Sequence, residues 1–129
     1  MAGKLAVTDP NDPFFVDCPQ RVRDVQAAMQ AAGIDAYLGS RPRTLSWLLD
    51  AFIPWRSYVL VPAEGMPTLF TFLLDGARIA SETWLDADHV QGYAGLPGME
   101  PLPSVAKAIK QQIGGRPGRV AYEDGISVY

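Results

Sequence analysis

Residues 57–73 read SYVLVPAEGMPTLFTFL, and this stretch decides the fold class of the chain. Its two ends, Ser57 to Pro62 and Thr68 to Leu73, are rich in β-branched and aromatic residues and predict two strands. The five residues between them, 63–67, have the length and the composition of a hairpin connection. We therefore expect two neighbouring strands joined by a short turn.

An amphipathic helix is predicted upstream of this strand pair. Asp17 or Cys18 stands at its cap, Pro19 lies in the first turn, where a missing N–H is harmless, and Gly33 ends the helix. Apolar residues recur on one face at spacings of three and four: Cys18, Val22, Val25, Met29 and Ala32.

Three further helices are expected. A short one covers Thr44 to Leu49, after a turn at Arg41-Pro42-Arg43, and a second short one follows Asp75, which caps it. The last helix starts at Ser104 and ends at Gly114. Its apolar stripe is Leu102, Val105, Ile109 and Ile113.

Three more strands are predicted at residues 34–39, 89–93 and 119–123. Helices and strands thus alternate along the chain, and this order is typical of an α/β fold with a mixed, about five-stranded sheet and helices on both faces.

The two ends of the chain differ from the middle. Residues 1–16 are rich in turn residues and predict an irregular arm, whose aromatic end at Phe14 and Phe15 is expected to dock on the body. The folded domain is expected over residues 17–129. Residues 124–129 complete no element, so we expect the chain to be a piece of a longer protein.

Composition limits the possible functions. A chain of 129 residues with 48% hydrophobic residues fits one domain, and a net charge of −3 gives no electrostatic reason to expect nucleic acid as a partner. The single cysteine excludes an internal disulfide and favours a cytoplasmic location. The single histidine excludes metal sites that need two imidazoles. Apolar runs are too short to span a membrane, and no signal peptide is visible.

Three kinds of residue are candidates for chemistry, and each also has a purely structural interpretation. His89, oriented by Asp86 or Asp88, is a candidate general base, or else a strand-edge imidazole with one hydrogen bond. Cys18 is a candidate thiolate at a helix N-terminus, or else a small core residue. Carboxylates at element ends are candidates for a two-metal nuclease site, or else caps and strand flanks: Asp35, Asp75, Asp88 and Glu123.

Arginines and aromatic residues are interleaved between residues 41 and 56. A guanidinium beside aromatic rings can bind a carboxylate with two hydrogen bonds while the rings hold an apolar group. The alternative is an ordinary loop with core aromatics. The residues concerned are Arg41, Arg43 and Arg56 around Trp47, Phe52 and Trp55.

Several of these segments resemble the creatinase N-terminal domain, which precedes the catalytic domain of the prolidase, aminopeptidase P and creatinase family. The likeness covers about residues 20–125 and rests on the order and spacing of its motifs. The chain departs from the common pattern at Leu48-Leu49-Asp50, where many members have Thr-Gly after the leucine. The matching segments are 21–29, 33–38, 45–49, 56–62, 65–69 and 119–123.

The resemblance implies a three-layer α/β/α domain of the ribonuclease H-like type that is not itself catalytic. Such a domain supports a homodimer, and it walls one side of the partner subunit's active site. The divalent metal pair and its ligands belong to the C-terminal catalytic domain, which residues 1–129 do not include. Arg56 matches the position from which some members reach the substrate carboxylate, and Trp55 precedes it.

The resemblance therefore favours one part of a metal-dependent hydrolase that acts on Xaa-Pro peptides or on a small amidino acid. A free-standing ligand-binding or interaction module is the alternative, and a small metal nuclease is disfavoured by the negative charge.

Overall fold

The five strands of the computed structural model, which describes residues 5–123, form one mixed sheet. The strand order across the sheet is β4-β3-β2-β1-β5. β2 lies antiparallel to both β1 and β3, while β4 is parallel to β3 and β5 is parallel to β1. The predicted hairpin is confirmed as the β2–β3 pair. The strands are β1 (Ala36–Gly39), β2 (Tyr58–Pro62), β3 (Thr68–Phe72), β4 (Val90–Tyr93) and β5 (Val120–Tyr122).

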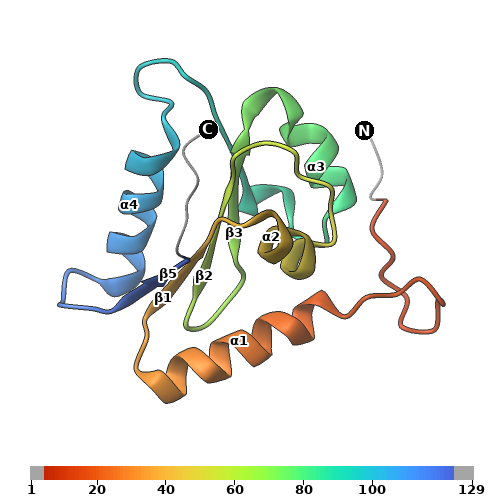
Figure 1. Ribbon diagram of the computed structural model, residues 1–129, viewed down its shortest axis with the longest axis horizontal. Helices are drawn as coiled ribbons and strands as arrows, with labels where there is room; N and C mark the ends of the chain where they lie inside the picture. Colours follow the sequence, from red (N-terminus) through yellow and green to blue (C-terminus); the bar gives the residue numbers. More distant parts are fainter. Residues whose placement is uncertain (1–4, 124–129) are drawn as a thin grey trace.

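Helices cover both faces of this sheet, so the α/β prediction with three layers is confirmed (Figure 1). α1 (Cys18–Ala32), α2 (Pro42–Leu49) and α3 (Gly76–Glu82) lie on one face, and α4 (Pro101–Ile113) lies on the other. Two short 3-10 helices, η1 (Leu73–Asp75) and η2 (Ala87–His89), lead into α3 and β4.

Each face of the sheet has its own hydrophobic core. The face under α1, α2 and α3 buries a large cluster to which all three helices contribute, for example Val22, Leu48 and Ile79. The face under α4 buries a smaller cluster of five side chains: Ala36, Tyr58, Leu60, Phe70 and Val105.

α1 forms where it is predicted. The Asp17 carboxylate accepts the Gln20 amide at 3.0 Å, and Gly33 ends the helix in the left-handed region with φ 69°. Cys18, Val22 and Met29 are buried and Val25 is half-buried. Ala32 is exposed, although Met29 in the same last turn is buried, so the predicted stripe ends at Met29 and its last member is wrong.

Two helices begin earlier than predicted, and the physical reason is proline. α2 starts at Pro42 and α4 at Pro101, since proline is favoured in a first helical turn, where its missing N–H is not needed. The predicted turn at residues 41–43 is therefore wrong. Leu102 lies in that early first turn of α4 with 58% of its surface exposed, so it does not belong to the apolar stripe.

The N-terminal arm touches the body through its backbone. The Leu5 amide donates to the Ser81 carbonyl at 2.6 Å, beside α3. Phe14 is 80% exposed, so the expected docking of the aromatic end is wrong at this residue, while Phe15 and Val16 are half-buried. Within residues 5–123, none of the helices is long and apolar enough to cross a bilayer.

Candidate functional site

The loop between α2 and β2, residues 50–57, carries three of the candidate side chains, those of Phe52, Trp55 and Arg56. Asp50 ends α2 in the left-handed region, with φ 51°, and turns the chain away from the helix. Ala51 and Ile53 then point into the core, while Phe52 and Trp55 remain exposed. Ala51 and Ile53 thus anchor the loop in the core, and the residues next to them expose their side chains at one end of the sheet.

Trp55 is held in place by neighbours on η1 and β3. Its indole N–H donates to the Asp75 carboxylate at 2.8 Å. Its ring lies 4.9 Å from that of Phe72, which in turn lies 6.4 Å from the ring of Tyr93. These tilted pairs have the geometry that aromatic rings prefer. Three rings therefore line the end of β3 and β4 with Trp55 outermost.

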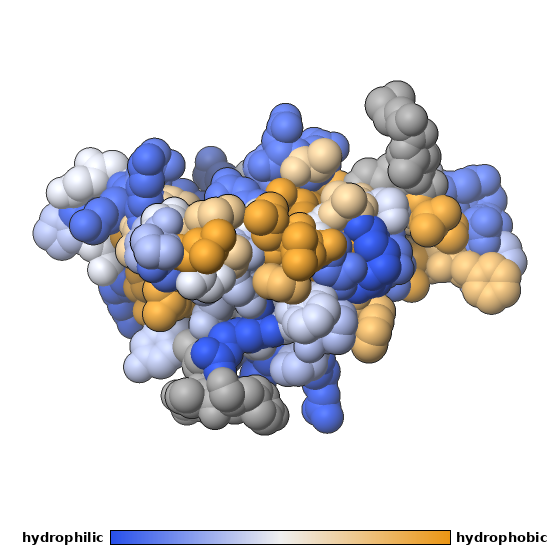
Figure 2. Space-filling view, turned by 90° about the horizontal axis from the view of Figure 1, so that it is seen from above, coloured by the Kyte–Doolittle hydropathy of each residue, from blue (hydrophilic) through white to orange (hydrophobic). Residues whose placement is uncertain are grey.

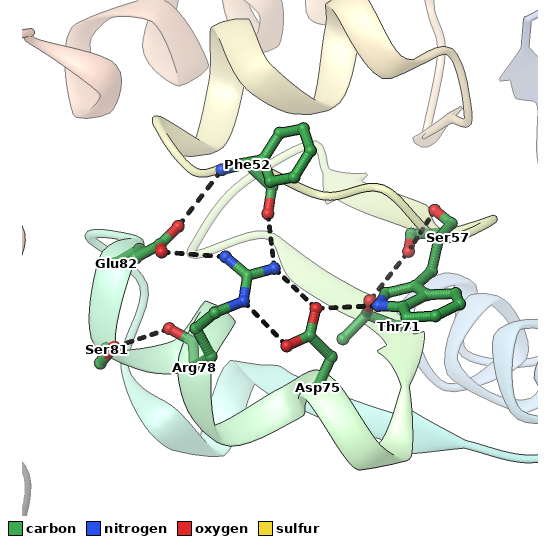
Figure 3. A network of polar contacts seen from close by, with 8 residues as sticks. Phe52, Ser57, Thr71, Asp75, Arg78, Ser81 and Glu82 are labelled. Atoms are coloured by element: carbon green, nitrogen blue, oxygen red, sulfur yellow. Dashed lines mark hydrogen bonds and ion pairs between the residues drawn. The ribbon is translucent and has the colours of Figure 1, made fainter.

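A guanidinium ties the same loop to α3 (Figure 3). Arg78 donates from Nε and one terminal nitrogen to the two oxygens of Asp75, at 2.8 and 2.6 Å, and to Glu82 at 2.9 Å. It also donates to the Phe52 carbonyl at 2.9 Å, and the Phe52 amide donates to Glu82 at 3.3 Å. We call Asp75, Arg78 and Glu82 the Arg78 network.

The backbone around Arg56 is fixed from both sides. The Tyr93 hydroxyl donates to the Arg56 carbonyl. The buried Ser57 hydroxyl lies 3.0 Å from the Trp55 carbonyl, to which it donates, and 2.9 Å from the Thr71 hydroxyl. Burial raises the pKa of Tyr93, which keeps this phenol protonated as a donor. Arg56 itself is exposed, so a rigid backbone carries an accessible guanidinium.

Arg56 and Trp55 lie together at the rim of a hollow of about 930 Å³, which we call the Arg56 hollow. It lies on the α4 face, between the ends of β2, β3 and β4 and the first turn of α4. Rings and one charge of each sign line it: Trp55, Tyr58, Phe72 and Tyr93 with Arg56 and Glu100. Such a set can hold a small carboxylate whose body packs on aromatic rings.

The interleaved cluster predicted between residues 41 and 56 is not one site. Trp47 and Arg43 line a separate apolar groove of about 590 Å³ between α1 and α2. The Arg21 guanidinium lies over the Trp47 ring at 5.0 Å, and that of Arg78 lies over Phe52 at 5.8 Å. Arg43 and Trp47 are four residues apart on α2 and so lie on one face of the helix, and this face borders α1 rather than the loop at residues 50–57.

Cys18 has the structural role. Its thiol is buried and donates weakly to the Trp47 carbonyl at 3.7 Å. Burial, followed by the nearby negative charge of Asp50, raises its pKa to about 11. A thiol with a raised pKa is the opposite of an activated thiolate, so the functional interpretation of Cys18 is wrong.

Three of the four candidate carboxylates are engaged by the protein's own donors, while the fourth, Asp88, is exposed. Asp35 accepts from Arg116 at 2.7 Å and from the Arg119 amide at 2.8 Å, and these contacts hold its pKa below its usual range. Glu123 accepts from the Ser40 amide at 2.7 Å and the Thr44 hydroxyl at 2.6 Å. Asp75 belongs to the Arg78 network and makes no capping hydrogen bond to α3, which corrects its predicted role.

A metal centre finds no support in the described part of the chain. Residues 5–123 bring together no group of three histidine, cysteine or carboxylate side chains that could hold an ion. His89 is half-buried, and its Nδ1 lies 3.3 Å from the Thr68 hydroxyl. This contact fits the strand-edge interpretation of His89.

Sequence reasoning missed the residues that support the loop. No motif marked Arg78, Tyr93 or Glu100. Arg78 nevertheless follows Asp75 by three residues and precedes Glu82 by four, and these spacings allow ion pairs on a helix. That spacing was a usable signal for the network. The contacts from Tyr93 to Arg56 and from Asp75 to Trp55 depend on tertiary packing and left no trace in the sequence.

Comparisons with known proteins agree with this architecture. Ectoine hydrolase from Halomonas elongata is 28% identical over 111 residues, which cover 80% of this chain and 28% of the relative, so the chain spans less than a third of that enzyme's length. A proline dipeptidase from Streptococcus pneumoniae matches with TM-score 0.65 and 20% identity over 84% of this chain and 76% of the other. An Xaa-Pro dipeptidase from Bacillus anthracis matches with TM-score 0.64 and 14% identity over 85% and 34%.

The family model described as the Creatinase/Prolidase N-terminal domain matches residues 21–129, which is most of the chain. The structural neighbours share the mixed sheet and its helices, and they confirm the fold that the resemblance implies. The chain therefore belongs to the creatinase/prolidase N-terminal domain family.

Proposed function

We propose that this domain is a non-catalytic part of a hydrolase, and that it places Arg56 and Trp55 at the edge of the active site of a partner subunit. The observation that carries this proposal is the contrast within Arg56, whose carbonyl is held by Tyr93 while its side chain is exposed. A guanidinium on a fixed backbone suits recognition of a substrate carboxylate, because little order is lost on binding.

The surface around Arg56 supports contact with another protein surface. Figure 2 views the molecule from the top of Figure 1 and shows hydrophobic side chains gathered across the middle of this end. Exposed apolar patches rimmed by polar residues are typical of protein interfaces. We infer a homodimer in which this end faces the partner's catalytic domain. The exposed apolar residues of the loop and of η1 are Phe52, Trp55, Leu73 and Leu74.

The reaction itself is assigned to a C-terminal catalytic domain that would hold a divalent metal pair. Family membership supports this part of the proposal, since related chains include proline dipeptidases and an ectoine hydrolase. The substrate is then an Xaa-Pro peptide or a small cyclic amidino acid with a free carboxylate. We place the protein in the cytoplasm, in keeping with its free cysteine.

A second function, a free-standing ligand-binding module, is favoured by one observation. Residues of this chain alone line the Arg56 hollow, which is large enough for a small molecule. Calorimetric titration of the 129-residue chain with proline dipeptides and with ectoine distinguishes the ligand-binding module from the subunit-edge role. Submillimolar binding by the isolated chain favours the module, whereas binding only in the presence of a catalytic domain favours the subunit-edge role.

The substrate role of Arg56 is tested in the full-length enzyme. Loss of one charge-assisted contact removes about 1.5–3 kcal/mol, so Arg56→Ala should lower kcat/KM by roughly tenfold to a hundredfold. Arg56→Lys should recover part of this loss, because an ammonium cannot make the planar two-point contact. Arg43→Ala, in the separate groove, is the matched control. Wild-type kinetics in Arg56→Ala would remove the substrate role.

A further inference from the structure

We propose that Arg78, acting through Asp75 and Glu82, is a positioning residue for the Trp55–Arg56 site, an inference that rests on the function proposed above. None of these three residues needs to touch substrate. Their place is on η1 and α3, behind the loop, and their hydrogen bonds end on the loop's backbone and on its tryptophan.

The first contact set fixes the middle of the loop. Both backbone polar groups of Phe52 are engaged, its carbonyl by Arg78 at 2.9 Å and its amide by Glu82 at 3.3 Å. Arg78 and Glu82 are themselves paired at 2.9 Å. The loop backbone is therefore held at Phe52 by a donor and an acceptor on adjacent turns of one helix, as a neighbouring strand would hold it (Figure 3).

The second contact set fixes the side chain next to Arg56. One oxygen of Asp75 accepts both from the Trp55 indole, at 2.8 Å, and from Arg78, at 2.6 Å. A change at Arg78 therefore frees the carboxylate that orients the indole. Since Trp55 forms one wall of the Arg56 hollow and directly precedes Arg56 along the chain, its orientation sets the shape of the site.

The ion pairs of Arg78 are partly buried and joined in a network, so they contribute to stability as well as to the shape of the loop. An ion pair elsewhere separates the two effects. Arg116 pairs with Asp35 at 2.7 Å, ties together the starts of β1 and β5, and touches no residue of the Arg56 hollow. Both arginines thus pair with carboxylates, but they lie beside different parts of the fold. Of these two arginines, only Arg78 contacts the loop that carries Trp55 and Arg56.

The closing experiment compares Arg78→Met with Arg116→Met in two measurements. In the 129-residue chain, the indole N–H of Trp55 is identified by nuclear magnetic resonance as the signal missing in Trp55→Phe. We expect Arg78→Met to shift this signal, to speed its exchange with water, and to lower the order of the amides of residues 52–56. Arg116→Met should leave all of these unchanged. If Arg78→Met does not fold, Asp75→Asn serves instead, and it too should shift the Trp55 signal.

In the full-length enzyme, we expect Arg78→Met to raise KM for a substrate with a free carboxylate by about tenfold, because a small displacement of a binding group is costly. The same substrate as its amide should show less than about a twofold change, and so should Arg78→Met added to Arg56→Ala. Arg78→Lys should restore part of the affinity.

Two failures are distinguishable. An unchanged Trp55 signal in folded Arg78→Met, or in Asp75→Asn where Arg78→Met does not fold, overturns the positioning role alone. Unchanged kinetics in Arg56→Ala overturn the substrate role, and the positioning role with it.

Discussion

The two faces of the sheet are covered to different extents. Three helices and the loop before β2 close one face over a large core, whereas α4 covers the other face over β2 and β3 and leaves the end of β4 open. The Arg56 hollow lies in that open part. The well-covered face therefore supplies rigidity, and the partly covered face supplies the surface on which a site can form.

Matched valine truncations test the difference between the faces and should give the largest effects on stability. Val22 on α1 and Val105 on α4 are equally buried, at 4% and 3% exposure. We expect Val22→Ala to cost about 2–3 kcal/mol and Val105→Ala about 1–2 kcal/mol, since surroundings that can relax leave a smaller cavity. Urea denaturation measures both. An equal or greater loss for Val105→Ala would contradict the comparison.

Acid should loosen the joint between β5 and α2 on the well-covered side. Burial raises the pKa of Glu123, but hydrogen bonds from the Thr44 hydroxyl and the Arg41 and Ser40 amides outweigh it and hold the pKa below its ordinary value of 4.5. A lowered pKa means that this stabilisation is complete above about pH 5 and is lost as the pH falls through the folded-state value.

Glu123→Gln isolates this contribution. We expect the variant to be less stable than the wild type by about 0.5–1.5 kcal/mol near neutral pH, the usual range for such hydrogen bonds. The difference should shrink as the pH falls through the folded-state pKa of Glu123, because both proteins then carry a neutral group at residue 123. Denaturation at a series of pH values measures it. A difference that widens on acidification would refute the assignment.

The smallest effect is expected at the start of the loop that joins the two faces. Asp50 adopts the left-handed conformation that favours glycine, and it stands where related domains often have Thr-Gly. Asp50→Gly should therefore change the free energy of unfolding by less than about 1 kcal/mol, in the stabilising direction. Thermal denaturation is sufficient to measure this. A loss of more than about 1 kcal/mol would show that the aspartate side chain is needed.

The strands, the hairpin and the helix order follow from local patterns, and those predictions are confirmed. The β2–β3 pair is visible in the sequence because its apolar residues and its turn are contiguous. The predicted helix starts at Thr44 and Ser104 are too late, since Pro42 and Pro101 open the two helices. Leu102 fits the spacing of the stripe but is exposed, because it lines the open Arg56 hollow and not the core under α4.

The site was predicted only in part. Arg56 and Trp55 both line the Arg56 hollow, and their role beside a substrate stays a prediction. Trp47 and Arg43 were grouped with them because sequence proximity does not reveal that α2 turns them toward α1. Tyr93 lies 37 residues from Arg56, and contacts at that range depend on how the strands are ordered in the sheet.

A mixed-subunit experiment tests the central claim most directly. One full-length subunit carries Arg56→Ala with an intact catalytic domain, and the other keeps Arg56 and has one metal ligand of its catalytic domain replaced by alanine. Alone, Arg56→Ala should show the roughly tenfold to hundredfold lower kcat/KM expected above, and the metal-ligand variant should be nearly inactive. If Arg56 serves the partner's active site, the mixed dimer joins one intact catalytic domain to one intact Arg56 and regains about half of the activity per dimer. Activity no higher than that of the separate variants would contradict the claim.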